Sequence, residues 1–147
     1  VLSKGSLGSS VGIIKSIVSG EYPRAPNLNF CIVDVRDVAK AHIIAMENED
    51  IKGQRYICST QGSMSCLEVA TVLKKNFPNM PIPTKSMPNF VMYVAAVMDS
   101  RLTWGWLSRN LNKKFMFDNS KIKKDMEVEF RDIEESLVDT VNSLVEF

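Results

Sequence analysis

The sequence predicts an α/β fold with two or more short strands and five or six helices, and three observations indicate it. Residues 30–35 alternate between two faces as a strand does, and helical spacing follows directly. A second short segment at 55–59, with strand-like composition, again precedes a helical pattern. This strand–helix–strand–helix order is typical of βαβ units. Two short strands do not form a stable sheet alone, so we expect the other strands to lie upstream.

The composition is that of one domain or part of one. The chain has 147 residues, and 45% of them are hydrophobic, which is enough for a core. The formal net charge is +1, and basic residues are interleaved with acids rather than gathered in blocks. This balance leaves no electrostatic footprint for nucleic acid or for an acidic membrane. We therefore expect neither among the partners.

The three cysteines, Cys31, Cys58 and Cys66, lie in apolar surroundings and are odd in number. We interpret them as buried free thiols in a reducing compartment, which favours a cytoplasmic location. With one histidine and no Cys-x-x-Cys, a metal site is not expected. No signal peptide is visible, and the longest apolar run, 90–98, is shorter than the roughly 20 residues that span a bilayer. A first residue other than Met suggests a processed form, a fragment or one piece of a longer polypeptide.

The first element along the chain is a helix over about 10–19. Its apolar face includes Ile14 and Ile17, and Gly20 is a suitable C-terminal stop. A loop punctuated by prolines follows at 22–27.

The stretch at 30–42 combines a strand, a sharp turn and a helix start. Asp37 stands where an N-cap belongs, and the helix is expected to end near Glu49. Arg36 is expected to pair with a carboxylate or to bond loop carbonyls. His42 invites a catalytic role, but its predicted position on an apolar face favours a satisfied core or interface histidine.

The middle of the chain contains the clearest helix signal. After a turn at 52–53 and the strand at 55–59, Ser65 and Glu68 form a capping box, and a helix runs from there to about Asn76. Prolines then impose an extended segment around 80–83.

The last third is predicted to be helical with one gap. Residues 89–98 are apolar all round, which predicts a mostly buried helix. Residues 101–112 give no clear assignment, and Trp104-Gly105-Trp106 suggests a turn. A short helix is expected from about 120 to 126, and a final helix from 132 with acids in its first turn.

Residues 33–42 (VDVRDVAKAH) and 53–59 (GQRYICS) resemble segments of the extended short-chain dehydrogenase/reductase family, in the NAD-dependent epimerase/dehydratase-like superfamily. Shorter resemblances occur at 20–23 (GEYP), 117–121 (FDNSK) and 134–137 (EESL). The pattern is most similar to the branch of dihydroflavonol reductases and cinnamoyl-CoA reductases. One departure is Glu127-Val128, where the family usually has Gly-Trp, and this puts the turn after the short helix in question.

The resemblance covers only the C-terminal half of such an enzyme. It implies the C-terminal part of an NAD(P)-binding Rossmann fold plus a mainly helical substrate-binding lobe. Residues 1–60 would join the Rossmann half, and 61–147 would form the lobe, as one cooperative unit. The family's Gly-x-x-Gly-x-x-Gly turn for the cofactor pyrophosphate is missing, because Gly5 and Gly8 follow no strand.

The family's catalytic Tyr-x-x-x-Lys is missing too. Tyr22, Tyr56 and Tyr93 are followed at the fourth position by Pro, Thr and Val. This chain alone therefore lacks the catalytic acid, and no catalytic residue is assigned. The implied cofactor is NADP, with NAD possible, and its binding would need the absent N-terminal half.

The resemblance also suggests site residues. Ser9 and Ser10 match a position that contacts the cofactor at a helix start, although serine there also serves as a plain helix cap. The C-terminal lobe supplies substrate specificity in this family, so residues 80–106 would shape an apolar pocket. The candidate pocket residues, each of which could equally be simple core, are Tyr22, Cys31, Met87, Phe90 and Tyr93.

The sequence leaves two functions of different class open. The first is the substrate-lobe portion of an NADP-dependent reductase that acts on aldehyde or ketone groups of hydrophobic or aromatic substrates. The second is a noncatalytic truncated lobe that binds a partner or associates with itself through the surface that would otherwise meet the Rossmann half.

Overall fold

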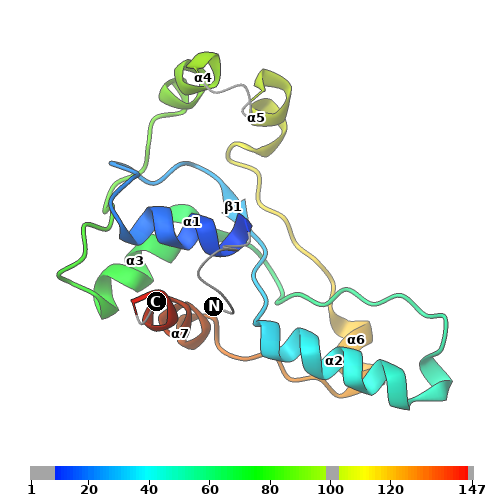
Figure 1. The fold of residues 1–147 in the computed structure, drawn as a ribbon. Helices are drawn as coiled ribbons and strands as arrows, with labels where there is room; N and C mark the ends of the chain where they lie inside the picture. The colour runs from blue at the N-terminus through cyan, green and yellow to red at the C-terminus, as the bar shows by residue number, and fades with distance from the viewer. Residues whose placement is uncertain (1–8, 99–102, 146–147) are drawn as a thin grey trace.

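The computed structural model describes residues 9–98 and 103–145. In this part of the chain, seven α-helices and one 3₁₀ helix surround a two-stranded antiparallel sheet. Figure 1 shows three groups: α1, α3 and α7 together, α2 beside α6, and α4 with α5 apart from the others. Each group has its own apolar cluster. The α/β class is as predicted, with one helix more than expected.

The largest cluster joins α1 (Ser9–Val18), α3 (Cys66–Asn76) and α7 (Ile133–Val145). Ile17, Leu73 and Val141 meet there with no exposed surface. The predicted helical stripes of these segments are therefore confirmed as core-facing. We call this group the body.

Local signals at the ends of the body helices are also confirmed. The Ser65 hydroxyl accepts the Glu68 N–H at 3.1 Å, while the Glu68 carboxylate accepts the Ser65 N–H at 2.6 Å, which completes the predicted capping box. Gly20 follows α1 with φ of 77°, and a Cβ there would lie 2.9 Å from the Pro81 side chain. Only glycine fits both the left-handed backbone and this close approach.

The predicted strands are largely wrong. Only Asn29–Phe30 (β1) and Met64–Ser65 (β2) pair, in antiparallel register, whereas 31–35 and 55–59 form no regular strand within the described chain. Near the sheet, the Ile32 carbonyl still accepts the Thr60 N–H at 3.3 Å. The pairing does not continue, because two short strands without a third form too few backbone hydrogen bonds to hold a longer extended segment.

The start of α2 (Val35–Glu47) differs from the prediction by one turn. Its N-cap is Asp34, not Asp37, and the Asp34 carboxylate accepts the Arg36 N–H at 2.8 Å. Asp37 lies inside the first helical turn and is buried. Its carboxylate instead accepts the Arg131 N–H at 2.8 Å, which ties α2 to the segment before α7.

The second cluster lies between α2, the 3₁₀ helix Glu49–Ile51 and α6 (Ser120–Met126). The chain leaves α6 through Glu127, whose φ of 50° is left-handed, and then buries Val128. The turn after the short helix, which the sequence put in question, therefore forms here with glutamate in the strained position.

The third group differs most from expectation. Helix α4 (Asn89–Met98) forms, but it is not mostly buried: Phe90 is 69% exposed and Val97 is 75% exposed. Residues 104–106 are the first turn of α5 (Trp104–Asn110) rather than a loop, because the Thr103 hydroxyl caps that helix by accepting the Trp106 N–H at 3.2 Å. We call α4 and α5 together the α4–α5 lobe.

Candidate functional site

The α4–α5 lobe brings together two of the five predicted pocket residues. Met87 and Tyr93 pack around buried Met92 and Leu107, and the Tyr93 ring lies 5.3 Å from the Trp104 ring. Phe90 belongs to the same helix, but its side chain is exposed on the outer surface.

The other two predicted pocket residues lie elsewhere. Tyr22 packs against the core of the body. Cys31 is partly buried next to β1, and burial raises the pKa of its thiol, which disfavours the thiolate. The structure therefore does not bring Tyr22 or Cys31 into the lobe's cluster. Of the three free cysteines, only Cys66 is fully buried.

Asn27 holds the lobe to the body. Its side-chain amide donates to the Met87 carbonyl at 2.9 Å and to the Asn89 side chain at 2.7 Å. Its own carbonyl accepts the Asn112 N–H at 2.9 Å. Sequence reasoning missed this residue, and the available signal was an amide side chain directly after Pro26, in a loop whose backbone groups need partners.

The described residues of the lobe and its connections carry charge of one sign, while Asp99 and Arg101 in the link between α4 and α5 lie outside the described residues. Residues 80–98 and 103–117 contain no Asp or Glu. They contain four basic residues, Lys85, Arg109, Lys113 and Lys114.

The proposed cofactor contact lies at the start of α1. Ser10 is exposed there, and the first turn of α1 has no acidic residue that would repel an anion. The side chain of Ser9 is outside the described part of the chain. An exposed hydroxyl at a helix N-terminus is compatible with one edge of a dinucleotide, but the pyrophosphate itself needs a glycine-rich turn that the sequence does not contain.

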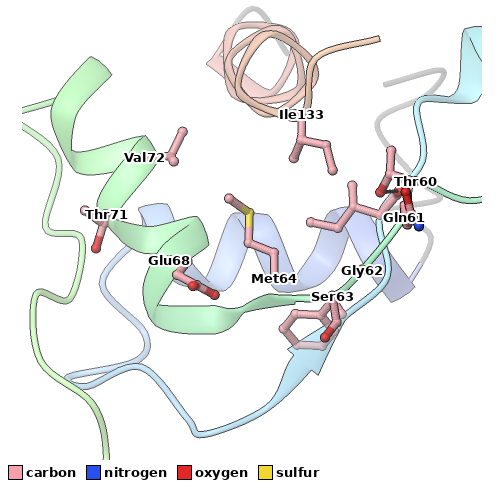
Figure 2. Close-up of a pocket in the computed structure, with 11 residues that line it drawn as sticks. Thr60, Gln61, Gly62, Ser63, Met64, Glu68, Thr71, Val72 and Ile133 are labelled. Atoms are coloured by element: carbon pink, nitrogen blue, oxygen red, sulfur yellow. Dashed lines mark hydrogen bonds between the residues drawn. The ribbon is translucent and has the colours of Figure 1, made fainter. Parts of the chain in front are cut away.

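A groove of about 470 Å³ beside the sheet was not predicted (Figure 2). Its walls come from β1, β2, the 60–63 turn, α3 and the start of α7, and they are mainly apolar. Several polar side chains in it already have partners: the Thr60 hydroxyl donates to the Ile32 carbonyl, and Glu68 belongs to the capping box. The described lining of the groove includes no His, Cys, Lys or Arg.

Tyr56 has the surroundings of a structural tyrosine. Its hydroxyl donates to the Asp125 carboxylate at 3.0 Å, and Lys121 lies over its ring at 4.7 Å. Burial and then the Asp125 carboxylate raise the pKa of Tyr56. A tyrosine that acts as a general acid near neutral pH needs a lowered pKa. The surroundings of Tyr56 therefore do not suit that role.

The charged residues of 34–42 are structural. Arg36 bridges Asp34 at 2.7 Å and Asp139 of α7 at 2.9 Å, as the predicted carboxylate pairing requires. The Arg36 guanidinium holds the pKa of Asp34 well below its usual range. His42 is exposed rather than in a core, because the buried face of α2 is the opposite one, with Asp37 and Ala41. Its Nδ1 lies 2.8 Å from the Val38 carbonyl oxygen.

Within residues 9–98 and 103–145, no group of three or more His, Cys, Asp or Glu side chains is placed to hold a metal ion. None of the helices there is long and apolar enough to cross a membrane.

Comparison with known proteins gives a consistent family. No protein-family profile matches the chain. Among curated proteins, cinnamoyl-CoA reductase 1 of Petunia hybrida is 32% identical over 96% of this chain, and the NADPH-dependent methylglyoxal reductase of Saccharomyces cerevisiae is 28% identical over 98%. The chain spans only 36% and 38% of the lengths of these relatives.

Solved structures agree. The Gre2 crystal structure from Candida albicans matches 99% of this chain with a TM-score of 0.67 and 30% identity, and 39% of that structure is covered. Yeast Gre2 in complex with NADPH matches 98% of this chain with a TM-score of 0.68 and 29% identity. The chain thus belongs to the extended short-chain dehydrogenase/reductase family and corresponds to the C-terminal part of such a reductase, in the branch that includes the cinnamoyl-CoA reductases.

Proposed function

We propose that the chain is the substrate-lobe portion of an NADP-dependent reductase that acts on aldehyde or ketone groups of hydrophobic or aromatic substrates. The observation that carries this proposal is the match of nearly the whole chain, in sequence and in fold, to reductases of that cofactor class. NADPH supplies the hydride in this chemistry, and a cofactor half with the glycine-rich turn and the Tyr-x-x-x-Lys pair must complete the site. The noncatalytic alternative gains no support, since the relatives it matches are reductases.

In this proposal the α4–α5 lobe forms one wall of the substrate pocket. Trp104 exposes aromatic surface beside Tyr93, and Phe90 exposes a further ring on α4, which suits an aromatic substrate. Met87 gives the wall an adaptable side chain, and Tyr22 and Cys31 would contribute only if the cofactor half brings them to the same pocket. The wall binds and orients the substrate and keeps water from the reacting carbonyl.

Ser9 and Ser10 are proposed to meet the nicotinamide end of the cofactor at the start of α1. The exposed hydroxyl of Ser10 supports this role. We also propose a cytoplasmic location, which the free cysteines favour. We propose that the boundary at residue 60 separates two segments of one cooperative unit rather than two independently folding domains, because Ile17 and Leu73 share one core.

The test is a steady-state assay of the complete polypeptide, with its cofactor half, against one aromatic and one small aliphatic aldehyde. Trp104→Ala should raise KM for the aromatic aldehyde several-fold and leave KM for the aliphatic one nearly unchanged. Val145→Ala, at an exposed position of α7, is the matched control. Absence of NADPH-dependent reduction of either class by the folded polypeptide would overturn the proposal.

A further inference from the structure

The loop between α1 and β1 holds both ends of the α4–α5 lobe, which stands apart from the other helices in Figure 1. At the entry to the lobe, the Ala25 N–H donates to the Lys85 carbonyl at 2.9 Å, and the Met87 N–H donates to the Ala25 carbonyl at 2.7 Å. At the exit, the Asn112 N–H donates to the Asn27 carbonyl at 2.9 Å. The position of the lobe therefore depends on this one loop.

Asn27 is the residue of the loop that contacts both ends. Its side-chain amide donates to the Met87 carbonyl at 2.9 Å and to Asn89 Oδ1 at 2.7 Å, which uses both amide hydrogens. Asn112, at the other end, has a left-handed φ of 57°, which asparagine adopts at a lower cost than most residues. Its bond to Asn27 helps to keep the exit of the lobe in that turn.

The contacts of Asn27 lead to the aromatic surface of the lobe. Asn89 begins α4, and Tyr93 follows four residues later, which places both on one side of this helix. The Tyr93 ring in turn lies 5.3 Å from the ring of Trp104 in α5. Leu28, next to Asn27, packs against the same cluster as Tyr93. Because closely packed side chains transmit displacements, a shift at Asn89 would move both rings of the proposed substrate wall.

The loop itself is anchored in the body. Ala25 has no exposed surface and belongs to the core of the body. The Leu28 carbonyl accepts the Cys66 N–H at 2.9 Å, where α3 begins, and β1 starts at the next residue along the chain. Asn27 thus lies between a fixed frame and the lobe, and its bonds hold the lobe in place relative to that frame.

From these contacts, and resting on the proposed function, we propose that Asn27 is a positioning residue that sets the size of the carbonyl substrate. In this role Asn27 does not touch the substrate. It holds the wall formed by Tyr93 and Trp104 at a fixed place relative to the body. A bulky aromatic aldehyde contacts that wall and depends on its position, whereas a small aliphatic aldehyde does not reach it.

A role in stability alone predicts a different result. Loss of a hydrogen bond that only stabilises the fold lowers the amount of folded enzyme, and this affects the reduction of every substrate alike. Loss of a positioning bond raises KM for the substrate that needs the wall and leaves kcat and the other substrate nearly unchanged.

The experiment measures NADPH-dependent reduction of benzaldehyde and of propanal by the complete polypeptide, with its cofactor half. Asn27→Asp is the central variant, because a carboxylate has nearly the shape of the amide but cannot donate to the Met87 carbonyl. It should raise KM for benzaldehyde about fivefold or more, and change KM for propanal and both kcat values by less than about twofold. Asn79→Asp, the same change at an exposed asparagine, is the matched control and should leave every constant unchanged.

Two further variants link the effect to the wall. In a Trp104→Ala background, Asn27→Asp should raise KM for benzaldehyde by less than about twofold, because the contact that it positions is already lost. Asn89→Ala removes one of the two bonds of the Asn27 amide and covers the case in which Asn27→Asp does not fold. It should give a smaller rise in KM, again for benzaldehyde and not for propanal.

The positioning role of Asn27 is overturned by any of three results. These are equal KM values for Asn27→Asp and the wild type, a rise for propanal that matches the rise for benzaldehyde, and full additivity with Trp104→Ala. Failure of the wild-type polypeptide to reduce either aldehyde would instead overturn the proposed function, and the positioning role with it.

Discussion

The body and the α4–α5 lobe are both built from apolar helices, yet they use their apolar residues in opposite ways. In the body, Ile17, Leu73 and Val141 close against one another with no exposed surface. In the lobe, Phe90 and Val97 remain open, although α4 is the more apolar segment. The difference shows that apolar composition predicts a helix but does not by itself predict burial, which depends on what packs against that helix.

The largest expected effect is the difference in unfolding free energy between a variant in the body and a variant in the lobe. Leu73→Ala should lower the free energy of unfolding by about 3 kcal/mol, because it leaves a cavity in a closed core. Val97→Ala, on the open side of α4, should change it by about 0.5 kcal/mol or less. Chemical denaturation of residues 1–147 measures both. Similar losses for the two variants would remove the distinction between body and lobe.

The next effect concerns the connection between the two regions. Asn27→Ala removes the amide that bonds the Met87 carbonyl and the Asn89 side chain, and it should cost about 1–2 kcal/mol. Amide exchange should accelerate in 87–98 and 103–111 but not in α3. The exposed Asn79→Ala is the control. Acceleration throughout α3 would show that the lobe and the body unfold together.

A smaller effect, of opposite sign, is expected after α6. Glu127→Gly should stabilise the chain by about 1 kcal/mol, because glycine adopts a φ of 50° without the Cβ clash. Glu129→Gly, nearby in ordinary backbone, should destabilise it instead. Thermal unfolding midpoints compare the two. A loss of stability in Glu127→Gly would mean that the turn is not strained.

The smallest effect is a dependence on pH. Because Arg36 holds the folded-state pKa of Asp34 below its unfolded value, this carboxylate stabilises the fold above about pH 4 and loses that contribution as the pH falls towards the folded pKa. Asp34→Asn should therefore flatten the decline of stability with acidification. Unfolding free energies measured across this range check it, and an unchanged slope would assign the acid sensitivity to other carboxylates.

Features set by residues close in sequence were easier to predict than features that need a distant partner. The stop at Gly20, the capping box at Ser65 and the start of the last helix were predictable, since the groups involved are close in sequence. The strand at 55–59 was predicted from composition, but its pairing needs a strand that the described chain does not supply. The change of period at Arg36-Asp37 predicts an N-cap at Asp37, whereas the bond from the Arg36 N–H to the Asp34 carboxylate makes Asp34 the cap.

The candidate site was predictable only in part. Met87 and Tyr93 meet because neighbouring segments of α4 and α5 pack locally. Asn27 contributes through contacts some 60 residues away along the chain, which no local pattern reveals. The side of α2 that faces solvent was likewise misjudged for His42, because a helix with two apolar faces gives no sequence signal for which one is covered.

The position of α5 has one more consequence, for spectroscopy. The chain has two tryptophans, and both Trp104 and Trp106 lie in the first turn of α5, 63% and 43% exposed. Intrinsic tryptophan fluorescence therefore reports on the lobe and not on the body. Emission from residues 1–147 should be that of indole in water, and it should shift to the blue when a substrate or the remainder of a reductase covers α5. No dye or engineered label is needed to observe that event.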